Sequence, residues 1–195
     1  MKKAGIVVVA LLCVALICGG FFLLKNRASE TKEEDLTKVQ KIITRNLDQD
    51  YPATPREVVK FYNRIVTSYY EGEYTADEFD ALTDQALALF DKELAENNPK
   101  STYEQQVKDS VENYKTRKRS ISTTSVCDSR DVVYLTDPDT GDEIAYVTAS
   151  YFVKENNSYD RTYQEYVLRR DEDEHWKILT FYKVEGESSE DDKDE

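Results

Sequence analysis

The chain has 195 residues and a formal net charge of −13, with 39 Asp and Glu residues against 26 Lys and Arg residues. Four of the basic residues lie within the first 27 positions, which contain no acidic residue. The rest of the chain therefore carries a formal charge of −17. Such a charge repels phosphate backbones, so we expect no nucleic acid partner.

An uncharged, apolar segment runs from Ala4 to Leu24 and is followed directly by Lys25. Roughly 20 apolar residues in a helix match the hydrocarbon core of a bilayer. The segment is longer than the apolar core of a cleaved signal peptide and lacks its cleavage motif. We therefore predict a short cytoplasmic n-region (residues 1–3) and one uncleaved transmembrane helix (residues 4–24), with cleavage or lipid attachment as the alternative.

The sequence after this span divides into three parts. Residues 25–53 are predicted to form a charged stalk and a linker helix, in which apolar residues recur at helical spacing. Residues 54–184 are long enough for one domain with its own core. Residues 185–195 are acidic without apolar side chains, and we expect them to be a disordered tail. A short N-terminus before a single apolar span favours an extracytoplasmic position for the domain, at the cell membrane.

Three helix starts are predicted in the first half of the domain. The segment Thr54–Glu57 contains a cap, a proline and a capping-box glutamate, and it opens a helix that ends at Gly72. A second capping box, Thr75–Glu78, opens a helix predicted to continue to Asn97. A third, Ser101–Glu104, opens the last helix.

After residue 119 the sequence period changes to two, and Thr, Val, Ile and Tyr become frequent. Loops rich in Asp, Gly and Pro separate the runs. Helices followed by a meander of strands predict an α+β fold, with the helices on one face of an antiparallel sheet. The predicted strands are residues 121–127, 131–135, 143–153, 162–170 and 176–184.

The last hairpin, residues 166–179, reads as a strand, an acidic turn and a Trp-Lys-Ile strand. With the order of elements before it, this hairpin resembles the nuclear transport factor 2-like (SnoaL-like, cystatin-like cone) superfamily over residues 54–184. The resemblance implies a bent sheet around helices, with a conical pocket used for catalysis or for binding, and often pairing of two domains into a homodimer. The whole chain resembles anchored proteins of unassigned function from Gram-positive anaerobic bacteria.

Aromatic residues of the strands are the candidate ligand-binding residues. Tyrosine is abundant, with 14 in the chain. Phenol rings facing the inner surface of a bent sheet stack on sugars or aromatic ligands, and their hydroxyls form hydrogen bonds. The alternative is that these rings only fill the core. The candidates are Tyr146, Tyr163, Tyr166, Trp176 and Tyr182.

Metal and cofactor sites are not expected from the sequence. His175 is the only histidine, which excludes a site with two imidazole ligands. The acidic turn at residues 137–143 has its glycine one position too early for an EF-hand loop. Cys127 is the only cysteine after the apolar segment, so the domain has no intramolecular disulfide. We interpret it as a half-buried strand residue.

Together these features favour a membrane-anchored extracytoplasmic domain that binds a protein or a cell-envelope component and has no catalytic activity. The alternative is an enzyme of the isomerase, dehydratase or hydrolase kind, which uses a carboxylate near a tyrosine in the cone. Glu165 beside Tyr163 is an example of such a pair. A structural role in secretion or division machinery is a third hypothesis.

Overall fold

The computed structural model describes residues 36–185. The chain divides into two compact units, Met1–Lys41 and Ile42–Glu195. The predicted n-region, the transmembrane helix (residues 4–24) and the tail beyond residue 185 lie outside the described residues. Between residues 36 and 185, no helix combines the length and the apolarity needed to cross a membrane.

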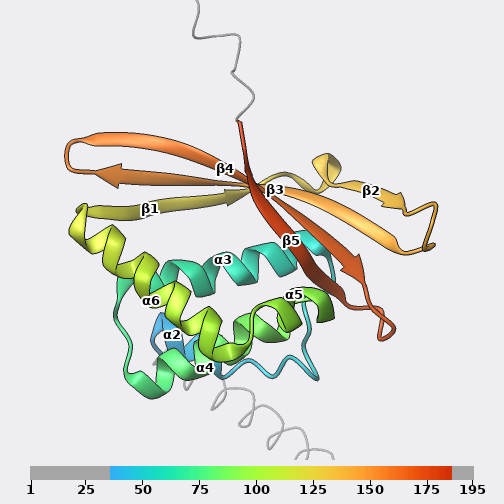
Figure 1. The fold of residues 1–195 in the computed structure, drawn as a ribbon, viewed down its shortest axis with the longest axis horizontal. Helices are drawn as coiled ribbons and strands as arrows, with labels where there is room; N and C mark the ends of the chain where they lie inside the picture. Colours follow the sequence, from blue (N-terminus) through green and yellow to red (C-terminus); the bar gives the residue numbers. More distant parts are fainter. Residues whose placement is uncertain (1–35, 186–195) are drawn as a thin grey trace, which may run out of the picture. The chain divides into compact units, whose positions relative to one another are not determined.

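Four helices of the described chain form one layer of the second unit. Helix α2 (Lys38–Ile43) lies across the boundary between the units. It is followed by α3 (Pro55–Glu71), α4 (Ala76–Ala88), α5 (Lys92–Asn97) and α6 (Lys100–Thr116). Figure 1 shows α3 to α6 on one face of the sheet. This arrangement confirms the prediction that the helices pack on one face.

The predicted N-cap and C-cap of α3 are confirmed, but the predicted capping box at Glu57 is not formed. The Thr54 hydroxyl accepts a hydrogen bond from the Glu57 N–H at 3.2 Å, as an N-cap does. The Glu57 carboxylate accepts from the N–H of Ala53 rather than from that of Thr54. Gly72 closes the helix at φ 70°, a left-handed conformation that costs glycine little.

The predicted single helix over residues 75–97 is wrong, although its capping box at Thr75 and Glu78 is present. The chain leaves the helix after Ala88, because its backbone pairs with the last strand instead. The Leu89 carbonyl accepts from the Ile178 N–H, and the Asp91 N–H donates to the Ile178 carbonyl, both at 2.8 Å. Asp91 then caps α5.

The predicted start of the last helix at Ser101 is also wrong. Pro99 occupies the N-cap position and provides no side-chain hydrogen bond. Its carbonyl accepts from the N–H of Tyr103 at 3.0 Å. Because this backbone bond already closes the first turn, Ser101 lies inside α6 and does not cap it.

The sheet has five strands, all paired antiparallel. They are β1 (Arg119–Val126), β2 (Val133–Thr136), β3 (Glu143–Glu155), β4 (Ser158–Arg170) and β5 (Trp176–Val184). The order is β1-β3-β4-β5, and β2 pairs with β3. Since β4 occupies one edge of β3, β1 and β2 share the other edge, as Figure 1 shows. The connection from β1 to β2 contains a short 3-10 helix, η1 (Ser129–Asp131).

The central hairpin is longer than predicted, because the polar residues 154–161 continue the ladder. Glu155 pairs with Ser158 across a two-residue turn. Asn156 takes φ 54° in this turn, which asparagine tolerates better than most residues. Exposed polar residues near the turn hide the period-two signal, so the prediction placed a loop here.

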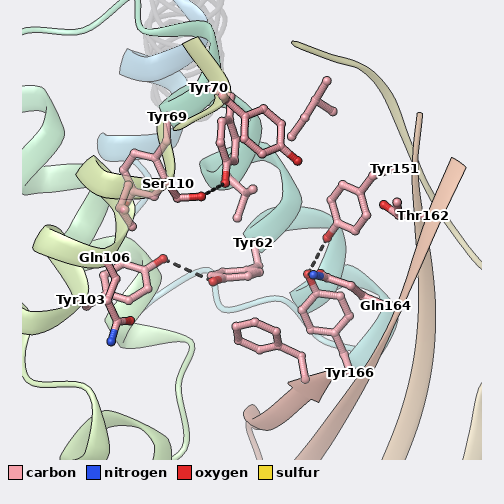
Figure 2. A pocket seen from close by; sticks show the side chains of 15 residues that line it. Tyr62, Tyr69, Tyr70, Tyr103, Gln106, Ser110, Tyr151, Thr162, Gln164 and Tyr166 are labelled. Atoms are coloured by element: carbon pink, nitrogen blue, oxygen red, sulfur yellow. Dashed lines mark hydrogen bonds between the residues drawn. The ribbon is translucent and has the colours of Figure 1, made fainter. Parts of the chain in front are cut away.

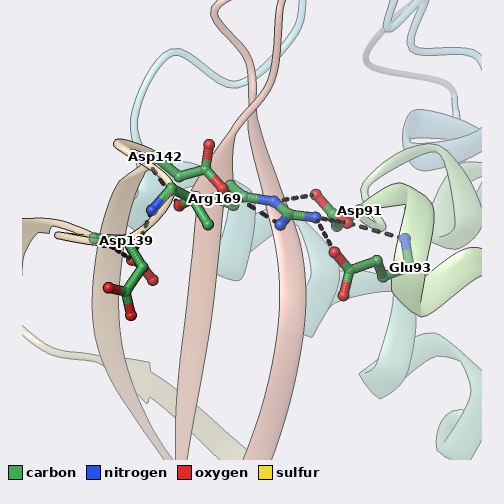
Figure 3. Close-up of polar contacts among 7 residues, drawn as sticks. Asp91, Glu93, Asp139, Asp142 and Arg169 are labelled. Atoms are coloured by element: carbon green, nitrogen blue, oxygen red, sulfur yellow. Dashed lines mark hydrogen bonds and ion pairs between the residues drawn. The ribbon is translucent and has the colours of Figure 1, made fainter.

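One partly buried ion pair ties α5 to the sheet. Arg169 on β4 contacts Asp91 through Nη2 at 2.6 Å and through Nε at 3.1 Å, in the arrangement of Figure 3. The same guanidinium reaches Glu93 at 2.8 Å and Asp142 at 3.5 Å. The hydrogen bond to Asp91 is the main cause that raises the pKa of Arg169.

Replacing Asp91 tests this connection. Asp91→Ala removes the N-cap of α5 and the most buried partner of Arg169, so we expect a loss of about 2–4 kcal/mol in the free energy of unfolding. Glu93→Ala is the matched control, because its side chain is 64% exposed and should cost only ~0.5 kcal/mol. Urea denaturation measures both, and equal losses would contradict the assigned roles.

Candidate functional site

A cavity of about 230 Å³ lies between α3, α6 and the inner face of the sheet. Figure 2 shows tyrosine side chains from both layers around this space. Seven tyrosines line it, together with Phe181 and a few small or polar side chains. The seven are Tyr62, Tyr69, Tyr70, Tyr103, Tyr114, Tyr151 and Tyr166.

The residues of α3 and α6 that line the cavity recur at helical spacing along each helix. On α3, Tyr62, Val66 and Tyr69 recur at intervals of three and four residues, with Tyr70 beside them. On α6 the stripe consists of Tyr103, Gln106, Val107, Ser110 and Tyr114. Residues at this spacing share one face of a helix, so each helix presents a single stripe to the cavity.

The sheet wall follows from strand alternation. Thr162, Gln164 and Tyr166 alternate along β4 and point toward the helices. Tyr151 on β3 is the register partner of Thr162, and Phe181 on β5 is that of Tyr166. Three neighbouring strands therefore contribute to one wall.

A hydrogen-bonded cluster connects the tyrosines of this wall to α3. The Tyr151 hydroxyl lies 2.5 Å from the hydroxyl of Tyr166 and 2.5 Å from the Oδ1 atom of Asn63. The Tyr166 hydroxyl also contacts Gln164 Oε1 at 3.0 Å and Asn63 Oδ1 at 3.4 Å. Asn63 is only 2% exposed, so this α3 residue fixes both sheet tyrosines from inside the core.

Two further contacts connect the helical walls to each other. The Tyr70 hydroxyl and the Ser110 hydroxyl lie 2.7 Å apart, and the hydroxyls of Tyr62 and Tyr103 lie 3.3 Å apart. The ring of Tyr70 also packs against that of Tyr114, with centroids 4.3 Å apart. These contacts hold α6 at a set distance from α3 and keep the space between them open.

The cavity is electrically neutral although the chain is strongly acidic. Among the described residues that line it, none carries a charged side chain. Burial raises the pKa of Tyr62, Tyr103 and Tyr166, and it raises the pKa of Tyr151 to about 12. The phenols are therefore protonated at neutral pH, and they act as hydrogen-bonding groups and aromatic surfaces.

The structure places the five candidate residues in different parts of the sheet. Tyr166 lines the cavity. Tyr146, Tyr163 and Tyr182 belong to the opposite face, because Tyr163 lies three positions from Tyr166 on one strand and side chains alternate. Trp176 is buried at the start of β5, where its ring packs against that of Tyr134.

Sequence reasoning missed the helical half of the cavity. The tyrosines of α3 and α6 have the spacing of a buried helical face, and this spacing does not distinguish a core side chain from a cavity wall. The stripe at Tyr103, Val107, Ser110 and Tyr114 was the available signal, because it places hydroxyl groups on the face that turns inward.

The carboxylate of the enzyme hypothesis does not reach the cavity. Glu165 lies on the face of β4 opposite to Tyr166, and its carboxylate accepts a hydrogen bond from the Tyr182 hydroxyl at 3.1 Å. Tyr163 shares that face. Both side chains are therefore separated from the cavity by the sheet itself.

The turn between β4 and β5 brings Asp171, Asp173 and His175 within 4.8 Å of one another. Asp171 Oδ1 already accepts two backbone N–H groups of the turn, and Lys177 lies 3.9 Å from its other oxygen. The His175 ring stacks on Tyr51 at 4.2 Å. These contacts account for the cluster as a turn that its own side chains stabilise.

Cys127 is partly buried, as predicted, but it directly follows β1 and does not lie within the strand. Its thiol pKa is raised, mainly by burial, which makes it less reactive at neutral pH.

Comparison with known proteins identifies a family. A family model described as "Domain of unknown function (DUF6715)" matches residues 1–181. No curated protein matches the chain.

The buried phenols predict a loss of stability at alkaline pH. Tyrosine in the unfolded chain titrates near pH 10, whereas Tyr151 titrates at about 12 in the fold. The folded state therefore binds more protons above pH 10, and the free energy of unfolding falls as pH rises toward 12. Tyr151 alone contributes about 2–3 kcal/mol to this fall.

Urea denaturation at about pH 8 and about pH 11 measures the effect. Tyr151→Phe should reduce the pH dependence, because it removes the titrating group. Tyr159→Phe is the matched control, because its ring is 56% exposed and lies outside the cavity. An unchanged pH dependence in Tyr151→Phe would contradict this account.

Proposed function

The chain belongs to the DUF6715 family, and we propose that its α+β domain is a binding module that holds a small organic molecule in the tyrosine cavity. The observation that carries the proposal is the cavity wall of seven phenol rings without a charged side chain among the described residues. Ring faces and hydroxyl groups together recognise ligands that have both apolar and polar surface.

The chemistry of the wall supports binding over catalysis. General acid–base catalysis needs a group whose pKa lies near the working pH. The groups at this wall are phenols, hydroxyls and amides, and burial raises the pKa of the Tyr62 and Tyr166 phenols. They orient a ligand through hydrogen bonds but do not exchange protons with it at neutral pH.

The volume of the cavity limits the ligand. A dry cavity of about 150 Å³ holds a benzene molecule. The tyrosine cavity, at about 230 Å³, has room for one ring with substituents or for a branched molecule of similar size. Gln106 on α6 lines the cavity and is exposed, so the cavity wall reaches the surface at this residue.

We also propose membership of the nuclear transport factor 2-like superfamily. It is supported by the helical layer on one face of an antiparallel sheet and by the position of the cavity between them. In that arrangement the sheet bends around the helices as a cone, and the cavity is the interior of the cone.

We also propose that the domain acts outside the cytoplasm, at the cell membrane. An apolar span at residues 4–24 anchors the chain in the cell membrane and places the domain outside the cytoplasm. The ligand or partner then belongs to the cell envelope or to the surrounding medium. The apolar sequence of the span and the short segment before it support this placement.

A ligand screen with a blocked cavity tests the binding function. We expect ligand-observed NMR to detect at least one member of a panel of glucose, phenol and choline with the full chain. Val107→Trp fills the cavity from α6 and should abolish binding. Glu112→Trp is the matched control, because it adds the same ring to an exposed position of the same helix. Binding that survives Val107→Trp would contradict the assigned site.

Protease access tests the anchored topology. A tag at the C-terminus of the full chain should be removed by external protease from intact cells, while the chain stays with the membrane fraction. A tag that is cleaved only after lysis, or a chain recovered in the soluble fraction, would overturn this part of the proposal.

A further inference from the structure

We propose that the open edge of β2 is a docking surface for an extended, basic segment of another protein, which pairs with β2 as an additional strand. No residue of β2 lines the tyrosine cavity, so this inference goes beyond the proposed ligand-binding function. Three features support it: the apolar side chains of β2, the backbone groups on its open side and the acidic turns beside it.

The strand β2 exposes apolar side chains on both faces of the sheet. Val133, Tyr134 and Leu135 are consecutive, and they are 56%, 55% and 42% exposed. They are three of the five large hydrophobic side chains that are exposed in the described chain. Charged residues, proline or a bulge commonly protect an edge strand from pairing, but β2 has none of these. A partner strand would cover these apolar side chains.

The backbone of β2 has hydrogen-bonding groups on its open side. The Asp137 N–H donates to the Asp142 carbonyl at 2.8 Å, next to the last pair of the β2–β3 ladder. Because bonded pairs alternate along an antiparallel ladder, Leu135 bonds to β3, whereas the N–H and C=O groups of Tyr134 and Thr136 point away from it. Within the described chain, β2 pairs with β3 alone. An extended polypeptide satisfies such groups by adding a strand to the sheet.

The opposite edge of the sheet, by contrast, is partly covered by the chain itself. Leu89 and Asp91 form two backbone hydrogen bonds of 2.8 Å with Ile178 on β5. Figure 1 shows β2 at the margin of the sheet, and none of the described segments runs along its open side. This side is therefore accessible to a strand from another molecule.

Two acidic turns lie at the end of the sheet where β2 ends. Residues 137–142 follow β2 directly, and residues 171–175 join β4 to β5 at the same end, as Figure 1 shows. Trp176 follows the second turn, and its ring packs against that of Tyr134 with centroids 5.7 Å apart. A strand added to β2 therefore has one end beside these turns.

The acidic turns favour a basic partner. They contain seven Asp and Glu residues and neither Lys nor Arg. Basic side chains of the strands pair with some of the carboxylates. Asp139, Glu172 and Asp173, however, form no ion pair with any described residue. Carboxylates without a counter-ion attract Lys and Arg side chains of a partner.

The same charges disfavour two other occupants of this edge. A second copy of the chain would bring two sets of acidic turns close together, and like charges at an interface repel. Residues 186–195 of the chain itself are also predominantly acidic. The occupant that fits is therefore a segment of another protein in which apolar residues are flanked by Lys or Arg.

Fluorescence anisotropy of labelled peptides with the full chain, in an uncharged detergent, tests the inference. One peptide alternates valine and threonine and has lysines at both ends, and its analogue has glutamates instead of the lysines. We expect the lysine peptide to bind at least about tenfold more tightly at low salt. The difference should shrink at ~1 M salt, because ions screen the charges. Absence of binding by the lysine peptide, or equal binding of both peptides, overturns the proposal.

Two substitutions at one exposed position show whether binding uses the backbone. Thr136→Pro removes an N–H group on the open side and leaves the bonds to β3 in place, so this variant is expected to fold. It should weaken the lysine peptide by at least about tenfold, whereas Thr136→Val keeps the N–H group and should stay within about threefold of wild type. If Thr136→Pro binds as wild type does, the attraction comes from net charge alone and the docking surface is wrong.

Two further measurements separate this surface from the cavity and from self-association. Val107→Trp fills the tyrosine cavity and should bind the lysine peptide as wild type does, whether or not the cavity holds a ligand. Loss of peptide binding in this variant would place the peptide in the cavity. Sedimentation of the full chain should give the same mass for wild type and Thr136→Pro. A dimer that Thr136→Pro dissociates would assign the edge to a second copy and overturn the proposal.

Discussion

The fold depends on the packing of α3 against the inner face of the sheet. Val58, Val59 and Ile65 on this helix are completely buried, and the helix contacts β1, β3 and β5 as well as α4 and α6. Both walls of the cavity are positioned from α3. Asn63 binds the sheet tyrosines, and Tyr62 and Tyr70 connect to α6. The element that forms the core therefore also shapes the cavity.

Charge is distributed unevenly in this domain. Acidic and basic side chains form exposed or partly buried pairs at the surface, and Arg169 with Asp91 ties α5 to the sheet. The cavity lining is uncharged within the described chain, so its polarity comes from phenols, hydroxyls and amides. In this acidic chain, the neutral aromatic lining of the cavity is therefore distinct from the charged surface.

Local sequence patterns predicted an element correctly where a single local interaction determines it. The caps at Thr54 and Thr75 and the left-handed Gly72 follow from backbone hydrogen bonding, and the structure contains all three. The prediction was wrong where a segment distant in sequence competes for backbone hydrogen bonds. Residues 89–91 leave their helix because β5 offers backbone partners, and no local pattern records those partners. Polar side chains also hid the ends of the long strands β3 and β4 next to the two-residue turn at Asn156.

The sequence by itself determined the helix starts at Thr54 and Thr75, the approximate positions of the strands and the α+β class, because these follow from capping chemistry and from periodicity. It also identified tyrosine as the residue of interest, and it included Tyr166 among the candidates. Only the tertiary structure decided which tyrosines meet. Strand alternation sends Tyr163 and Tyr166 to opposite faces, and the register brings Tyr151 and Phe181 beside Tyr166. A cavity is a property of two packed layers, so neither layer's sequence specifies it alone.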